Sequence, residues 1–363
     1  MWYELARIPG SGHCDRGWDL LRYMQLSRHH RRVGQLMTQR ILVTGAAGFI
    51  GANLTRHILE STPYSITSLD RLDEAGNLAR LSDLKQRYPD RLKILWHDLR
   101  APVHASALRD EFRFIAHLAA GSHVDRSHTD PIGFVMDNVV GTANMLEWAR
   151  QHQPRTKFLF FGTDEVFGPA PVGVDFHEHS RFEPENLYAA TKAGAELLCL
   201  AYVHQHHMPI VATHCCNVYG PTQHREKFIP LAIEKIARGE LLQIHARDGA
   251  SSSRLYIHVD DVSRAVMTVL EQGGTINDDA SGRYNIRADQ ELSNLDVAQR
   301  IAKLMGRELR YELVENPPNR PKPDMRYALS DSKLRALGWA PKVDFDAGLE
   351  QVVNITAAGL AAE

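Results

Sequence analysis

Short apolar runs alternate with amphipathic segments along most of this chain. Runs of mainly apolar residues occupy positions 40–44, 65–69, 92–96, 114–118 and 156–161. Such runs predict strands of a parallel sheet, because these strands are buried on both faces. The segments 53–59 and 131–153 have the spacing of amphipathic helices. Strands that alternate with helices predict an α/β fold with a doubly wound parallel sheet of the Rossmann type.

The turn after the first predicted strand is rich in glycine. The strand 40–44 runs directly into GAAGFIG, and the second strand ends at Asp70, 19 residues after Gly51. In dinucleotide-binding folds, such glycines allow a tight turn and a close approach of the backbone to a pyrophosphate, and the acid binds a ribose diol. The order of strand, turn, helix, strand and acid therefore predicts dinucleotide binding. The acid favours NAD over NADP, although Arg71 follows it directly.

Composition and charge exclude several classes of protein. The chain has 363 residues, 44% of them hydrophobic, and a formal net charge of −2, so we expect no binding to nucleic acid or membranes. The sequence contains no run of 18 apolar residues, so we expect no transmembrane helix. The four cysteines lack the spacing of a disulfide scaffold, which favours reduced thiols and a cytoplasmic location. No metal site is expected, because His204, His206 and His207 have no cysteine or carboxylate at ligand spacing.

The pattern also predicts the domain organisation. We expect a NAD-binding domain at 37–215, with a return segment near 257–282, and a smaller C-terminal lobe, mainly for substrate, at 216–363. Residues 1–36 are rich in arginine and have little periodicity, so we expect a non-essential extension or a misassigned start codon.

Candidate catalytic residues follow the fifth predicted strand and lie on a later helix. Thr163, Asp164 and Glu165 stand where that strand leaves its apolar run, at the sheet edge where ligands bind in open α/β folds. Tyr188 and Lys192 are four residues apart, on one helix face. The lysine ammonium, with a nicotinamide ring, would lower the pKa of the phenol, so that it could take a hydroxyl proton. Two adjacent acids suit an elimination, because neighbouring carboxyls can act as one acid and one base.

Several motifs together resemble the nucleotide-sugar 4,6-dehydratases, a family of extended short-chain dehydrogenases/reductases, and most closely its dTDP-glucose branch. The resemblance covers about residues 40–345, and its most specific motifs are GTDEVFG (162–168) and SHVDRS (122–127). It implies that Tyr188 oxidises C4 of the sugar, that Glu165 removes the C5 proton, and that Asp164 protonates the departing C6 hydroxyl. NAD would be regenerated in each cycle.

The resemblance and the glycine turn together give the expected binding residues. The cofactor is expected at Gly45, Gly48, Phe49, Ile50, Gly51, Asp70, Asp98, Leu99, Ala119, Ala120, Tyr188 and Lys192, with His97 and Asp98 beside the adenine. The nucleotide sugar is expected at Ser122, Asn217, Lys227, Arg254, Arg320 and Asp324. The resemblance further implies a homodimer formed by helices near 137–152 and 188–207.

Some positions depart from the family pattern. Gly121 stands where the family usually has an acid, and Lys322-Pro323 replaces a Gly-His pair. The segment 254–256 reads Arg-Leu-Tyr in place of Arg-Asp-Trp, and Asn186-Leu187 replaces a Ser-Pro pair. These positions are expected to line the sugar and the nucleoside, so the base and the hexose stay open.

Two rival functions remain. A C4 epimerase or a decarboxylase of the same fold is one, although an epimerase has no elimination to perform with Asp164 and Glu165. The other is a catalytically silent protein that binds NAD or a sugar nucleotide.

Overall fold

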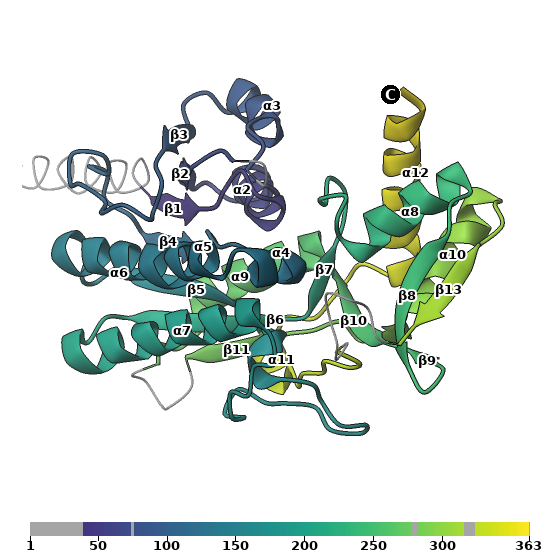
Figure 1. The fold of residues 1–363 in the computed structure, drawn as a ribbon. Coiled ribbons are helices and arrows are strands. Elements are labelled where there is room, and N and C mark those ends of the chain that lie inside the picture. The colour runs from purple at the N-terminus through teal and green to yellow at the C-terminus, as the bar shows by residue number, and fades with distance from the viewer. Residues whose placement is uncertain (1–38, 74–75, 277–281, 316–323, 363) are drawn as a thin grey trace, which may run out of the picture. The chain divides into compact units, whose positions relative to one another are not determined.

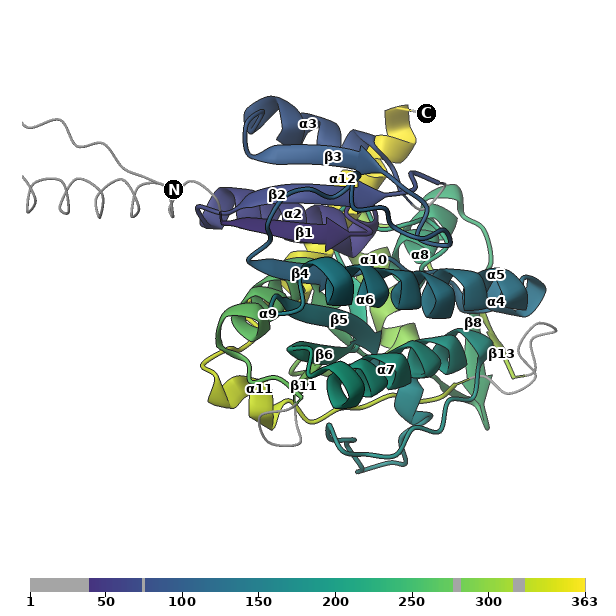
Figure 2. The ribbon, with the colours of Figure 1, turned by 90° about the vertical axis from the view of Figure 1, so that its left-hand side faces the viewer.

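A seven-stranded parallel sheet forms the centre of the described chain (Figures 1 and 2). The computed structural model describes residues 39–73, 76–276, 282–315 and 324–362. The strand order is β11-β6-β5-β4-β1-β2-β3. The bounds are β1 Arg40–Thr44, β2 Ser65–Asp70, β3 Leu92–Trp96, β4 Phe114–His117, β5 Lys157–Thr163, β6 Ile210–Cys215 and β11 Arg283–Ile286. The predicted doubly wound sheet is confirmed.

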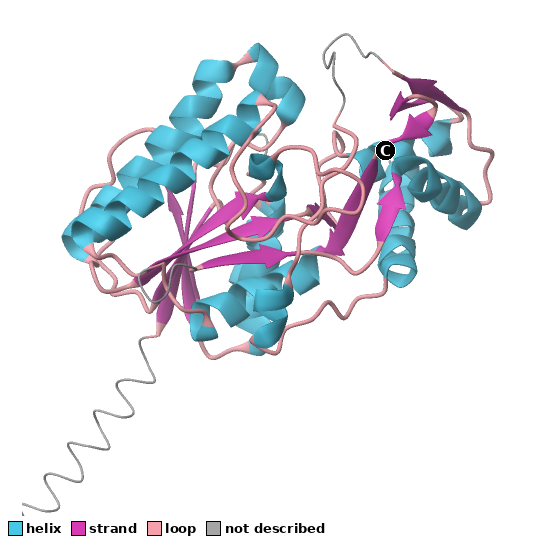
Figure 3. Cartoon of the chain, turned by 90° about the horizontal axis from the view of Figure 1, so that it is seen from below, coloured by secondary structure: helices cyan, strands magenta, loops and turns pink. Residues whose placement is uncertain are grey.

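Helices cover both faces of this sheet (Figure 3). Their bounds are α2 Phe49–Ser61, α3 Ala79–Arg87, α4 Val124–Thr129, α5 Pro131–Val135, α6 Gly141–His152, α7 Leu187–His206, α9 Val259–Gln272 and α11 Ser332–Ala336. Alternate residues of each strand serve the two faces: Ile41 and Val43 pack in one core with α2 and α9, while Leu42 packs in a second core with α6 and α7.

The predicted helix at 131–153 is interrupted by a π-helical turn. This turn, η1 Met136–Val140, joins α5 to α6. Asn138 in the turn is buried; its side chain donates to the Gly121 carbonyl (3.1 Å) and to Thr191 Oγ1 on α7 (2.8 Å), and its Oδ1 accepts from the Gly121 amide (2.7 Å). The turn thus fixes the loop after β4 against α7.

A second, smaller group of elements has its own apolar core. It contains α8 Phe228–Arg238, α10 Asn294–Met305 and α12 Phe345–Ala362, with the small sheets β12-β10-β7 and β13-β8-β9. The strand bounds are β7 Asn217–Tyr219, β8 Leu242–Arg247, β9 Ala250–Ser251, β10 Ser253–His258, β12 Glu291–Ser293 and β13 Tyr311–Val314. Between β10 and β12 of this group, the chain returns to the main sheet and forms β11. The predicted domain boundaries stay a prediction.

Two predictions concern segments that the structure does not describe: the extension at 1–36, and Arg320 with Lys322-Pro323. Within the described ranges, no helix combines the length and the apolar character that crossing a membrane requires.

Candidate active site

The glycine turn between β1 and α2 is packed too tightly for side chains. A Cβ atom on Gly51 would lie 2.1 Å from the Gly45 oxygen, and one on Gly45, whose φ is +70°, would lie 2.7 Å from the Ala119 nitrogen. Helix α2 starts at Phe49 without a side-chain cap and without an acid in its first turn. Its first N–H groups therefore suit an anion such as a pyrophosphate.

Asp70 ends β2 and holds the same turn in place. Its Oδ2 accepts from the Ala47 amide at 2.9 Å, and its Oδ1 accepts from the Leu72 amide at 2.9 Å. The side chain is buried, at 8% exposure, but it lines the cavity described next. The acid is thus presented to the cavity by the backbone on both sides of it.

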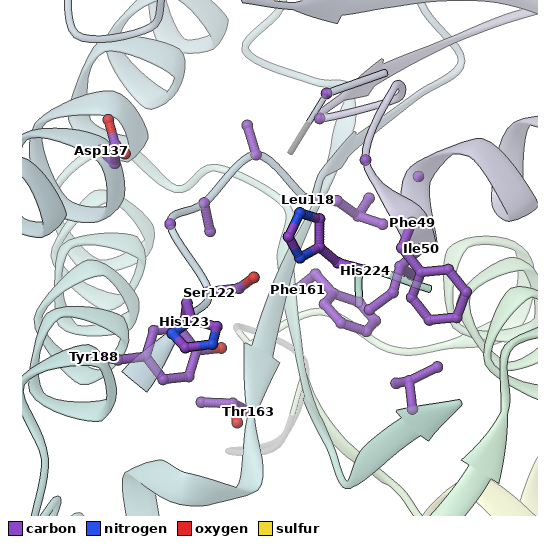
Figure 4. Close-up of a pocket in the computed structure, with 18 of the residues that line it drawn as sticks. Phe49, Ile50, Leu118, Ser122, His123, Asp137, Phe161, Thr163, Tyr188 and His224 are labelled. Carbon is purple, nitrogen blue, oxygen red and sulfur yellow. The ribbon is translucent and has the colours of Figure 1, made fainter. Parts of the chain in front are cut away.

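A cavity of about 550 Å³ lies beyond the carboxyl ends of the sheet strands (Figure 4). All twelve residues predicted for the cofactor line it. The candidates Thr163, Asp164, Glu165, Ser122, Asn217 and Lys227 line it as well. Figure 4 shows Tyr188 and Thr163 on one side, with Phe49 and Ile50 across from them.

Two predicted substrate residues do not line this cavity. The Arg254 guanidinium donates to the backbone oxygens of Ser253 (2.7 Å), Asp324 (2.9 Å) and Met325 (3.2 Å), and stacks on the Tyr327 ring. Asp324 is itself buried. Arg254 still acts on the site: burial raises the pKa values of Asp164 and Glu165, and the positive charge of Arg254 opposes this rise. Arg254 holds the segment at Asp324 and Met325 through their backbone oxygens.

Asp164 begins the short helix η2 Asp164–Phe167, directly after β5. The strand extends to Thr163, two residues beyond the predicted end, which carries the acids into the cavity. Burial, with the adjacent Glu165 charge, raises the pKa of Asp164 to about 8. Its Oδ1 accepts a hydrogen bond from the Thr163 hydroxyl at 3.3 Å, and its buried Oδ2 has no hydrogen-bond partner among the described residues. Asp164 is therefore a neutral carboxyl at pH 7, able to donate a proton.

Glu165 is held by Asn186, a contact that was not predicted from the sequence. The Asn186 side chain donates to Glu165 Oε2 at 2.7 Å, while its oxygen caps α7 by accepting from the Ala189 amide at 2.8 Å. Burial raises the pKa of Glu165, and the hydrogen bond from Asn186 opposes this change. Asparagine directly before a helix is a typical N-cap, and this was the available signal.

Tyr188 and Lys192 lie one turn apart on α7. The predicted lowering of the tyrosine pKa by Lys192 together with a nicotinamide ring stays a prediction. In the chain without cofactor, burial and the Glu165 charge raise the pKa of Tyr188, and the hydrogen bond with the Thr163 hydroxyl opposes this rise without cancelling it. The Lys192 ammonium donates instead to the Phe161 carbonyl at 2.7 Å. Burial lowers the pKa of Lys192 to about 8. Lowering the tyrosine pKa thus requires a further positive charge in the cavity.

A largely buried polar network lies behind α7, on the side away from the cavity, and supports the helix. Glu196 accepts from Arg283 Nε at 2.7 Å and bonds His214 Nε2 at 2.9 Å. His214 Nδ1 bonds Asn285 Oδ1 at 3.0 Å, and the imidazole packs 4.7 Å from the ring of Phe167 in η2. The network thus fixes both elements that carry the candidate catalytic side chains.

A Rossmann sheet with a glycine turn, an acid after β2, a threonine ending β5 and a Tyr-Lys pair on α7 defines an extended short-chain dehydrogenase/reductase. The profile of a family described as GDP-mannose 4,6 dehydratase matches residues 42–352. The chain belongs to this family.

Curated relatives and solved structures resemble the chain over most of its length. A low-salt glycan biosynthesis protein of Haloferax volcanii is 39% identical over 315 residues, covering 86% of this chain and 97% of that protein. A dTDP-glucose 4,6-dehydratase of Mycolicibacterium smegmatis is 38% identical over 321 residues, covering 87% and 92%. A crystal structure of the dTDP-glucose 4,6-dehydratase of Streptomyces venezuelae, with NAD bound, has a TM-score of 0.80 and 33% identity, covering 89% of this chain and 98% of that one.

Proposed function

We propose that this protein is an NAD-dependent nucleotide-sugar 4,6-dehydratase that forms a 4-keto-6-deoxy sugar, with dTDP-glucose as the first candidate substrate. The observation that carries the proposal is the pair Asp164 and Glu165 beside Thr163 and Tyr188 in a single cavity. An enzyme that only moves a hydride has no use for two further acids. The relatives named as dTDP-glucose 4,6-dehydratases support the same reaction and the choice of base.

The residues of the cavity fit NAD. Gly45, Gly48 and Gly51 line the cavity without side chains, so a pyrophosphate can approach the backbone there. Asp70 also lines the cavity and can accept hydrogen bonds from a ribose. When bound, NAD would supply the acceptor for the C4 hydride, its donor to C6, and a positive charge near Tyr188.

The side chains divide the proton transfers among them. Tyr188 takes the proton of the C4 hydroxyl, which the Thr163 hydroxyl holds in place. The resulting C4 ketone makes the C5 proton acidic, and Glu165 removes it. The C5–C6 double bond forms as the C6–O bond breaks, and Asp164 gives its proton to the departing hydroxyl, so that water leaves. After hydride returns to C6, Glu165 gives its proton back to C5.

The remaining binding residues are proposed on the same basis. Ser122, Asn217 and Lys227 line the cavity and are proposed to contact the nucleotide sugar. Arg254 and Asp324 are proposed to turn toward the diphosphate and the nucleoside ribose when substrate displaces their present contacts. Arg320 lies outside the described residues and keeps its predicted place at the diphosphate.

We further propose that the enzyme is a cytoplasmic homodimer. Large apolar side chains are exposed on the adjoining helices α5 and α7, notably Ile132 (70%) and Leu197 (55%). Exposed apolar side chains of this kind support a dimer interface in which these helices pack against a second copy of the chain.

Two alternatives of different kinds have less support. A C4 epimerase would use Thr163, Tyr188 and Lys192 but would leave the neutral Asp164 without a task. A silent binding protein would need none of these side chains in one cavity.

Incubation with nucleotide hexoses tests the proposal. Purified protein is incubated with dTDP-, UDP-, CDP- and GDP-glucose, and the products are followed by mass spectrometry. We expect the loss of one water molecule from one substrate without net consumption of NAD. An isomer of unchanged mass would support the epimerase, and no conversion at all would support the binding protein.

The Glu165→Gln variant tests the proposed base. It should keep NAD binding and C4 oxidation, while dehydration falls by roughly 10²–10⁴-fold, because no carboxylate removes the C5 proton. The measurement is absorbance at 340 nm alongside mass spectrometry of the sugar. Product formation at the wild-type rate would contradict the assignment.

A further inference from the structure

Arg71 follows Asp70 at the end of β2 and lines the cavity next to it. In dinucleotide-binding folds, an arginine at this place can accept the 2′-phosphate that distinguishes NADP from NAD. The sequence therefore contains both a residue that favours NAD and a neighbour that could favour NADP. The contacts of Arg71 decide between them.

The Arg71 guanidinium is held on two of its edges by carboxylates. Its Nη1 and Nη2 donate to the two oxygens of Asp137, at 2.5 and 2.9 Å, and its Nε donates to Asp73 at 2.5 Å. The Asp137 side chain is only 13% exposed, so its fork with Arg71 is shielded from water. Three of the five N–H groups of the guanidinium are occupied, including one on each of the two nitrogens that could form a fork with a phosphate.

Asp137 reaches this position through the π-helical turn η1. It lies beside Asn138, which fixes the loop after β4, and it lines the cavity (Figure 4). The loop leaves space for it: a Cβ atom on Gly121 would lie 3.4 Å from Asp137 Oδ2 and 3.3 Å from the Phe134 ring. A π turn within a helix is often found at a functional site.

A second arginine at this end of the cavity is paired in the same way. Arg100 lines the cavity and donates through Nε to both oxygens of Asp98, at 3.1 and 2.8 Å. Arg71 and Arg100 are thus both covered by carboxylates, and these carboxylates themselves repel a phosphate.

We infer that Asp137 is a specificity-determining residue for the cofactor, because it occupies Arg71 and thereby excludes the 2′-phosphate of NADP. The inference rests on the cofactor assignment in the proposed function. It assigns to η1 a role in cofactor choice that is separate from the ribose contact of Asp70.

Competition between the two cofactors tests this role without turnover. Full-length protein is incubated with an equimolar excess of NAD and NADP and then desalted, and the retained nucleotides are released by denaturation and quantified by chromatography. We expect Asp137→Asn to raise the retained NADP-to-NAD ratio about tenfold over wild type. The gain should disappear in Arg71→Ala/Asp137→Asn.

Two further variants complete the test. Asp83→Asn releases Arg87 from an exposed ion pair on α3 with the same change of charge, and it should leave the ratio unchanged. If Asp137→Asn does not fold, Asp73→Asn removes the other partner of Arg71 and should raise the ratio in the same direction. A folded Asp137→Asn protein with the wild-type ratio would overturn the inference alone. Wild-type protein that retains neither nucleotide would overturn the proposed function, and the inference with it.

Discussion

The burial of Asp164 affects both the protonation state of its carboxyl group and the stability of the folded protein. The side chain is 4% exposed, and its pKa is raised to about 8, against an ordinary value near 3.9. Between these two values the folded protein binds a proton that the unfolded chain does not. Stability is therefore highest below about pH 4 with respect to this group and falls as the pH rises toward 8.

The Asp164→Asn variant should remove this loss, because the amide stays neutral at every pH. The free energy of unfolding of the variant minus that of wild type should increase from pH 5 to pH 8 by roughly 3 kcal/mol. Dehydration should fall strongly, since the amide cannot protonate the leaving hydroxyl. Urea unfolding at both pH values checks the expected change in stability, and a difference that does not depend on pH would contradict it.

In the wild type, the rate of dehydration should decline above about pH 8, where Asp164 loses its proton.

Asn186 should affect the pH dependence of the proposed base. Serine at this position still caps α7, so Asn186→Ser should change stability by only a few tenths of a kcal/mol. Serine has no amide to donate to Glu165 Oε2, so the pKa of Glu165 rises and the acidic limb of the rate profile moves to higher pH. Initial rates of dehydration between pH 5 and pH 9 measure the shift. A uniform loss of rate across this range would indicate a different role.

At the scale of residues, the sequence was sufficient to predict those site residues whose role depends only on their neighbours in the chain. Gly45, Gly51 and Asp70 follow from spacing, because a turn between neighbouring elements is fixed by the residues within it. The burial of Asp164 and the contacts of Asn186 and Asp137 were not predictable, because each depends on a partner far away in the chain. The raised pKa of Tyr188 belongs to the same group.

The packing of helix α7 depends on Glu196, which is buried on the side of the helix away from the cavity and pairs with His214 and Arg283. Burial raises the pKa of Glu196, but His214 and Arg283 more than offset this, so that the net pKa is lowered. Stability from this group is present above its ordinary pKa and is lost as the pH falls through the lowered value. Removing one member of such a network leaves the others buried without their counter-charge.

Glu196→Gln should therefore lower the free energy of unfolding by roughly 3–5 kcal/mol at pH 7. The difference from wild type should shrink as the pH falls from the ordinary pKa of glutamate through the lowered pKa of Glu196, because the wild-type carboxylate then also becomes protonated. Glu147→Gln on α6 is the matched control, because its ion pair with Arg150 is exposed and should contribute less than about 1 kcal/mol. Equal effects of the two substitutions in urea unfolding would show that the buried network has no special weight.

At the scale of elements, the apolar runs located the strands well. The π turn η1 was missed, since the amphipathic pattern of 131–153 runs through it with little change. Its cause lies in the tertiary contacts of Asn138 with Gly121 and Thr191, and such contacts leave no local pattern.

The whole molecule presents one prediction about assembly. Leu197 lies on the exposed side of α7 and would be covered by a second copy in the proposed dimer. Leu197→Glu should shift the protein from dimer to monomer in light scattering, because a buried unpaired carboxylate is unfavourable. Val172→Glu, at a loop position with 95% exposure, should leave the mass unchanged. A dimer that survives Leu197→Glu would place the interface elsewhere.

The order of the strands in the sheet has a consequence for biosynthesis. Strand β6 ends at Cys215, but its neighbour β11 begins only at Arg283. The chain between them includes β7, α8, β8 and β10, which contribute residues to the second core. A chain that emerges from the ribosome therefore carries Glu196 and His214 for some time before Arg283 and Asn285 exist to pair with them. Domains generally fold as units during synthesis. The helix that carries Tyr188 is thus completed late in translation, and a chain that stops before residue 283 lacks the charge that holds it.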